Sequence, residues 1–275
     1  MVFDLRTCDS AYDFVLEFMG MTSREFFQNY YVDSNKDFED FWGNNNPRIK
    51  KANISDLRIM GFHVLGSLDD CEEIKTKGLW NLQKVLGNDT MLSRMLKKEG
   101  IIFNISDKLL YCGKTKYDID YDHYKNKEFL TETEIILDTI SHRVFYDYCI
   151  NGFLVCDNIF DYGTQIHERP EFLMRLSELL PGAQKIEEYW KAHSISYKVN
   201  FYVTVDQVQR FNFELDEQND PPYDGWFYLD EEMKIKKWLL NHAINRAYDE
   251  LHQEYLYLKD SVIVPSEQIM SYEKI

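Results

Sequence analysis

The chain has 275 residues, of which 44% are hydrophobic and 15% aromatic, and 31 Lys and Arg stand against 47 Asp and Glu for a net charge of −16. This length and apolar content are enough for one large domain with a sizeable core. So acidic a chain repels phosphate backbones at long range, which excludes a general nucleic-acid coat protein. Any contact with nucleic acid would need a local basic patch, or an enzyme that touches only a few nucleotides.

Residues 1–46 predict a helical extension rich in aromatic side chains. Apolar residues recur at helical spacing over 9–31, a further aromatic turn is expected at 37–42, and a break follows at 44–47. This pattern predicts two domains, the extension 1–46 and a main domain at 47–275. The extension either caps the main domain or docks a partner, and the residues leave both interpretations open.

The main domain mixes strands and helices without a regular βαβα order, so a doubly wound sheet is not expected. A basic segment at 48–58 is interpreted as a solvated loop or a local patch for nucleic acid, and 114–128 as a charged, tyrosine-rich surface loop. Strands are expected at 58–66, 101–105, 109–112 and 197–205. Helices are expected at 69–78, 79–86, 90–98, 131–140, 170–180, 183–193 and 233–252. An acidic loop is expected at 214–225, and a terminal hairpin with strands at 255–258 and 262–264.

Several kinds of site are not expected. The five cysteines form no CxxC pair, and their odd number favours reduced thiols in a cytoplasmic protein. Residues 1–20 lack the pattern of a signal peptide, and no apolar run is long enough for a membrane span. There is no HExxH, the seven histidines show no ligand spacing, and no metal site is expected.

Two stretches resemble the opening and closing motifs of ADP-ribosyltransferases. The first is FHVLGSLDDCEEIKTKGL at 62–79, in which a strand histidine is followed by a short helix and a Gly-Leu pair. The second is QEYLYLKDSVIVPSEQI at 253–269, in which a glutamate leads a strand and a proline-bounded partner strand follows. The resemblance is greatest to DarT-like toxins, although the middle motif of the family has no clear counterpart in this chain.

The resemblance implies an α+β fold with an ADP-ribosyltransferase-like split antiparallel sheet, flanking helices and the helical N-terminal extension. It implies that NAD is bound as substrate in a cleft between the sheet halves. In this interpretation His63 hydrogen-bonds the NAD ribose, and Glu254 stabilises the cation formed when nicotinamide leaves. A fixed carboxylate beside developing positive charge lowers the barrier to such an oxocarbenium-like transition state. The alternative is that His63 is a core histidine and Glu254 a solvated residue between helix and strand.

A second glutamate competes for the catalytic role. Glu171 also precedes an aromatic-Leu pair, but a helix follows it rather than a strand. Arg169 and Glu171 at this helix start could bind NAD phosphate or ribose, because helix N-termini and arginine suit phosphates. Tyr162 could stack on nicotinamide or adenine. The alternative is an ordinary charged helix cap.

The resemblance therefore predicts a cytoplasmic NAD-dependent mono-ADP-ribosyltransferase toxin that modifies an RNA or DNA base, within a toxin–antitoxin or phage-defence system. A protein target is the second form of this prediction, and a non-enzymatic interaction module is the alternative. The basic segment 48–58 or a cluster of three lysines, Lys234, Lys236 and Lys237, could contact nucleic acid, and aromatic side chains could stack an unpaired base. A neutralising antitoxin or inhibitor protein would then be a partner, and the extension 1–46 is a candidate docking surface.

Overall fold

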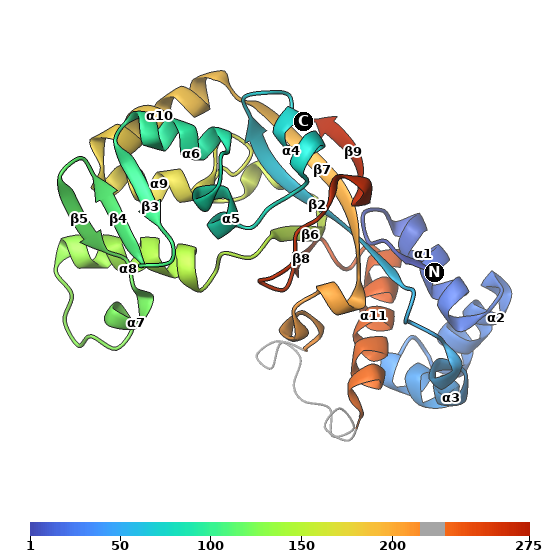
Figure 1. Ribbon diagram of the computed structural model, residues 1–275. Helices are drawn as coiled ribbons and strands as arrows, with labels where there is room; N and C mark the ends of the chain where they lie inside the picture. The colour runs from blue at the N-terminus through green and yellow to red at the C-terminus, as the bar shows by residue number, and fades with distance from the viewer. Residues whose placement is uncertain (215–228) are drawn as a thin grey trace. The chain divides into compact units, whose positions relative to one another are not determined.

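The computed structural model describes residues 1–214 and 229–275, so the expected acidic loop at 214–225 lies outside the described residues except for its first residue. The fold is mixed α/β with antiparallel sheets (Figure 1). It divides into two compact units. Unit 1 comprises Met1–Phe62, Gly152–Asp157 and Tyr202–Tyr257, and unit 2 comprises His63–Asn151, Asn158–Phe201 and Leu258–Ile275. No helix of the described residues is both long and apolar enough to cross a membrane.

The larger sheet has the strand order β8-β6-β2-β7-β9, with β1 paired to β2. Its strands are β1 (Val2–Phe3), β2 (Arg58–Ser67), β6 (Asn151–Cys156), β7 (Ile195–Thr204), β8 (Gln253–Tyr257) and β9 (Ile269–Lys274). The pairs β2–β6 and β7–β9 are antiparallel, whereas β1 runs parallel to β2. Most side chains of β2 are buried on both faces, as expected for a strand inside a sheet. The expected strands at 58–66 and 197–205 are thereby confirmed as β2 and β7.

The helices of unit 1 surround an aromatic core. They are α1 (Cys8–Met19), α2 (Ser23–Phe27), the π-helix η1 (Gln28–Asp33), α3 (Phe38–Lys51) and α11 (Glu231–Ala247). The ring of Phe3 lies 5.0 Å from that of Phe14 and 5.9 Å from that of Trp238. Because Phe14 belongs to α1 and Trp238 to α11, these buried rings join the N-terminal helices to a helix more than 200 residues later in the chain.

The expected break at 44–47 is wrong, because α3 continues through it with Pro47 inside the helix. Buried Phe41 and Ile49 lie on either side of this point, and their packing outweighs the hydrogen bond that proline cannot make. The expected loop at 48–58 therefore begins as the last helical turn of α3. In that turn Arg48 donates from Nη1 to the carbonyl oxygens of Met19, at 3.1 Å, and Gly20, at 2.9 Å, so it caps the end of α1.

Unit 2 contains a second antiparallel sheet and seven of the helices labelled in Figure 1. The sheet is β3 (Ile101–Asn104), β4 (Leu109–Cys112) and β5 (Thr115–Asp118). The helices are α4 (Glu72–Lys77), α5 (Leu82–Gly87), α6 (Met91–Lys98), α7 (Tyr121–Tyr124), α8 (Glu132–Phe145), α9 (Glu171–Leu179) and α10 (Pro181–His193). Their common core includes the fully buried side chains Ile101, Leu110, Ile140, Leu173, Leu176 and Ala183.

Two expectations for unit 2 need correction. The expected loop at 114–128 contains β5 and α7, because β5 pairs with β4 from Asp118 to Thr115 and extends the sheet. The helix expected at 183–193 begins two residues earlier, at Pro181, since proline fits the first helical position, where no N–H is needed; α9 ends just before it, at Leu179.

The expected terminal hairpin is also wrong. β8 pairs with β6, and β9 pairs with β7, so the last two strands are not partners. The expected second strand at 262–264 is reduced to one bridge, in which Val264 and Leu79 exchange backbone hydrogen bonds of 2.8 and 3.0 Å. Leu79 belongs to the Gly-Leu pair of the opening motif, so a long-range contact takes the place of the local hairpin.

Gly66 in β2 allows close approach of the loop before α9. A Cβ at this position would lie 2.4 Å from Glu168 O and 2.8 Å from Ser194 Oγ. We expect Gly66→Ala to lower the free energy of unfolding by about 1–3 kcal/mol, because the backbone must move to admit the methyl group. Urea denaturation would measure the change. Gly43→Ala is the control, because no atom lies within 4 Å of its added Cβ in α3; equal destabilisation by both variants would contradict the prediction.

Candidate functional site

His63 lies in β2, and a backbone carbonyl fixes its ring. Its Nδ1 is 2.7 Å from Asn151 O, and because a carbonyl oxygen only accepts, Nδ1 is the donor. Burial lowers the pKa of His63, and the bond to Asn151 opposes this only in part. The neutral ring therefore has its lone pair on Nε2, which makes Nε2 an acceptor for a hydroxyl group.

Polar contacts continue from Asn151 to the start of α9. Asn151 Nδ2 donates to Asp147 Oδ1 at 3.1 Å, and Asp147 Oδ2 accepts from Arg143 Nη1. Arg143 Nη2 lies 2.6 Å from Glu171 Oε2. These five residues (His63, Asn151, Asp147, Arg143 and Glu171) form what we call the His63–Glu171 network. It brings together two of the residues that the sequence singled out.

Arg143 is the charged centre of this network. Burial works against its charge, but the carboxylates of Glu171 and Asp147 outweigh that effect and raise its pKa further above the ordinary value. Tyr162 adds to the same shift, so its phenol lies close enough to interact with the guanidinium. Glu171 is thus a carboxylate oriented by an arginine at a helix N-terminus, where the helix dipole also favours negative charge. The network therefore contains the His63 imidazole, the Glu171 carboxylate and the Arg143 guanidinium, which are groups that suit a polyhydroxyl ligand.

Cys149 lies beside the network but is not a nucleophile. Its Sγ is 2.9 Å from Asn151 Oδ1. Burial, with the nearby charges of Asp147 and Asp260, raises the pKa of this thiol to about 12. Since the thiolate is the reactive form, the thiol of Cys149 is inert at neutral pH.

Arg169 belongs to a different cluster. It is only 3% exposed, and its Nε donates to Glu187 Oε1 at 2.7 Å while Nη1 donates to the carbonyl of Thr164. Burial opposes the charge of Glu187, but hydrogen bonds from Arg169, Ser177 and Lys191 lower its pKa to about 2. Arg169 therefore binds a carboxylate of its own chain, and this contact joins the start of α9 to α10.

Glu254 lies in unit 1, as the second residue of β8. Its Oε2 is 3.4 Å from Nε2 of His242, and Nδ1 of His242 donates to Trp238 O at 2.9 Å. The imidazole also stacks on the indole of Trp238, with ring centroids 3.8 Å apart. Packing in α11 thus fixes the imidazole beside Glu254, while Oε1 of the carboxylate accepts from the backbone N of Tyr255 at 3.2 Å. Such a carboxylate can act as a base or stabilise a neighbouring cation.

Ring contacts define the faces of the strands that carry these residues. Phe62 of β2 stacks on Phe153 of β6, and Phe153 contacts Tyr255 of β8, each at 5.5 Å between centroids. These three rings share one face, so Glu254, next to Tyr255, points to the opposite face.

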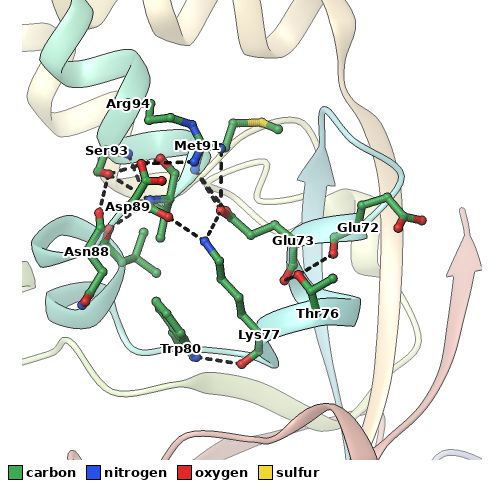
Figure 2. Close-up of polar contacts among 12 residues, drawn as sticks. Glu72, Glu73, Thr76, Lys77, Trp80, Asn88, Asp89, Met91, Ser93 and Arg94 are labelled. Atoms are coloured by element: carbon green, nitrogen blue, oxygen red, sulfur yellow. Dashed lines mark hydrogen bonds and ion pairs between the residues drawn. The ribbon is translucent and has the colours of Figure 1, made fainter.

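The short helix of the opening motif has a structural role that Figure 2 shows. Both carboxylate oxygens of Glu73 accept from the backbone N of Met91 at 3.1 Å, which caps the start of α6. Lys77 Nζ donates to Glu73 at 3.0 Å and to Asp89 O at 2.6 Å. Trp80 Nε1 donates to Lys77 O at 2.8 Å. The charges of this motif thus hold α4 against α6.

The burial of His63 predicts a pH dependence of stability. Its pKa is below 6.5 in the folded chain, so the unfolded chain binds a proton more readily. We expect the contribution of neutral His63 to the free energy of unfolding to be complete above pH 6.5. This contribution should be lost as the pH falls from 6.5 through the pKa of His63 in the folded chain. Urea unfolding at several pH values, for wild type and His63→Gln, would measure it. A difference between the two that does not change with pH would contradict the prediction.

Comparisons of the chain with protein-family models, with curated proteins and with solved structures give no match. Arg143, Asp147, Asn151 and His242 were not singled out from the sequence. The i,i+4 spacing of Arg143 and Asp147 is a local signal for their ion pair, but the contacts with Glu171, His63 and Glu254 arise only from the fold.

Proposed function

We propose that the chain is an NAD-dependent mono-ADP-ribosyltransferase. In this proposal His63 accepts a hydrogen bond from the NAD ribose at Nε2, and Glu254 stabilises the cation formed as nicotinamide leaves. The observation that carries the proposal is the fixed, neutral state of His63, whose Nδ1 is held by Asn151 O. Ribose hydroxyls are donors, and this tautomer presents the acceptor that they require.

The orientation of Glu254 supports the proposal. Its Oε1 accepts from the backbone N of Tyr255 at 3.2 Å, and a carboxylate that does not need to reorganise stabilises developing positive charge most effectively. The proposal includes an ADP-ribosyltransferase-like arrangement of the sheet. Against it stands the absence of the terminal hairpin that the closing motif predicts.

For the acceptor we propose an RNA or DNA base, contacted locally, and for the partner a neutralising protein. Lys236 and Lys237 are buried, where they bind Lys50 O and Glu39, so the lysines of α11 are not a basic patch. Lys50, Lys51 and Arg58 are exposed and remain the candidates for contact with phosphate. A protein acceptor is the second form of the proposal.

The direct test is transfer of label from NAD labelled in the ADP-ribose moiety. The purified chain would be incubated with single-stranded DNA, with RNA and with protein extract, and nicotinamide release would be measured in parallel. We expect label in one nucleic acid. Nicotinamide release without label in any acceptor would show that the chain hydrolyses NAD and does not transfer ADP-ribose. Absence of NAD binding in calorimetry would overturn the proposal.

One set of contacts favours the alternative of a non-enzymatic interaction module. Glu171 is paired with Arg143, Glu254 with His242, and Arg169 with Glu187, as in clusters that only hold a fold together. Phe129, 80% exposed, and Phe27, 55% exposed, are large apolar side chains on the surface that could contact a partner. Failure to bind NAD, together with a purified complex that the variant Phe129→Ser disrupts, would support this second candidate.

A further inference from the structure

Three side chains that can ligate metals meet at the surface of unit 1. Asp157 follows β6, whereas Asp249 and His252 lie in the turn between α11 and β8. One ligand atom from each lies within 4.8 Å of the others. His252 Nδ1 is 3.0 Å from Asp157 Oδ2 and 3.9 Å from Asp249 Oδ1. These separations are near the roughly 3–4 Å between neighbouring ligand atoms around an ion that binds at about 2.1 Å.

A sulfur donor lies next to this group. Cys8 begins α1, and its Sγ is 3.8 Å from Asp249 Oδ1. Cys8 is not one of the three residues whose ligand atoms all lie within 4.8 Å of one another, so its side chain would turn toward an ion bound there. The donors are therefore an imidazole nitrogen, two carboxylates and a thiol. Zn²⁺ accepts this mixture, whereas Ca²⁺ and Mg²⁺ prefer oxygen ligands alone.

A buried arginine, Arg246, holds these candidate ligands in place through hydrogen bonds. Arg246, 5% exposed, donates from Nη1 and Nη2 to the two oxygens of Asp157, both at 3.0 Å. Its Nε donates to Leu5 O at 3.0 Å and Nη1 to Leu251 O at 2.9 Å, so it fixes the backbone just before Cys8 and just before His252. Hydrogen bonds that hold ligands in place are a regular part of metal sites. Nη1 of Arg246 also lies 3.5 Å from Asp249 Oδ1, and its single positive charge offsets one of the two carboxylates.

We propose that Cys8, Asp157, Asp249 and His252 form a Zn²⁺ site that ties together the start of α1, the end of β6 and the turn before β8. The ligands come from three distant segments, which is why their spacing in the sequence predicts no metal site. The proposal is independent of the proposed enzymatic function, since it concerns the stability of unit 1.

Co²⁺ is the probe, because it enters Zn²⁺ sites and gives a visible spectrum. We expect saturable binding of one Co²⁺ per chain, displaced by Zn²⁺, with a sulfur-to-cobalt band that Cys8→Ser removes. We expect His252→Ala to weaken binding at least about tenfold. Zn²⁺ should raise the midpoint of thermal unfolding of wild type more than that of His252→Ala.

His123→Ala is the matched control. His123 is also exposed, and its Nδ1 lies 2.6 Å from Asp118 Oδ2 while its Nε2 lies 3.9 Å from Asp120 Oδ2, but among the described residues no group of three ligands within 4.8 Å of one another forms there. Its removal should leave the affinity unchanged, and equal losses from the two histidine variants would overturn the proposal as adventitious binding. Asp249→Asn, at an exposed position, provides a second variant if His252→Ala does not fold. Binding without the sulfur band would exclude Cys8 as a ligand, and no saturable binding would refute the site.

Discussion

Replacing Glu254 by glutamine is expected to slow ADP-ribosyl transfer on the order of 10²–10³-fold while NAD still binds. Glutamine keeps the shape of the side chain but removes the negative charge that the proposed mechanism places beside the developing cation. Single-turnover transfer of label from NAD would measure the chemical step, and calorimetry would measure binding. An unchanged thermal midpoint would show that the loss does not arise from unfolding.

Glu171→Gln is the matched comparison, because Glu171 is the rival carboxylate and also lies beside a nitrogen base of its own unit, Arg143, as Glu254 lies beside His242. We expect this variant to keep the rate of the chemical step within a few-fold, since Arg143 would retain Asp147 as its partner. The opposite pattern, with transfer lost in Glu171→Gln and kept in Glu254→Gln, would assign the catalytic role to Glu171.

Removing Arg169 is expected to have the largest effect on stability. Arg169→Ala should lower the free energy of unfolding by about 3–5 kcal/mol, because it leaves Glu187 buried with its principal partner gone. Chemical denaturation followed by circular dichroism would measure the change.

Arg175→Ala is the control for this prediction. Arg175 pairs with Glu178 on the same helix, α9, but the two side chains are 41% and 43% exposed. We expect a change within about 0.5 kcal/mol, because water screens such a pair. If Arg169→Ala is as stable as wild type and instead loses NAD binding, the role in phosphate binding predicted from the sequence would be supported.

Local patterns predicted the elements whose own residues specify them. The alternation of Tyr197–Thr204 gave β7, and the helical spacing of apolar residues gave α11. Predictions failed where proline was interpreted without its surroundings. Pro47 lies inside α3 because neighbouring side chains are buried, and Pro181, which follows the end of α9, is itself the first residue of α10. The terminal hairpin failed because the backbone groups around Val264 bond to Leu79, which no local pattern shows.

The candidate site was predictable only in part for a similar reason. The position of His63 within a strand follows from its apolar neighbours, but its partner Asn151 is 88 residues away. The ion pair of Arg143 with Glu171 and that of His242 with Glu254 also join separate elements. Sequence spacing describes the residues of one helix or strand, whereas these contacts depend on how the elements pack.

The passage of the chain between the two units at Phe62, Asn151, Asp157, Phe201 and Tyr257 has a consequence for biosynthesis. Unit 1 lacks α11 and β8 until Tyr257 has been synthesised, and unit 2 lacks β9 until later still. During synthesis on a ribosome, the apolar faces of helices α1 to α3 therefore stay uncovered until α11 has been made. Unit 1 is consequently expected to complete its core, and to place Glu254, only after the chain has been synthesised beyond Tyr257.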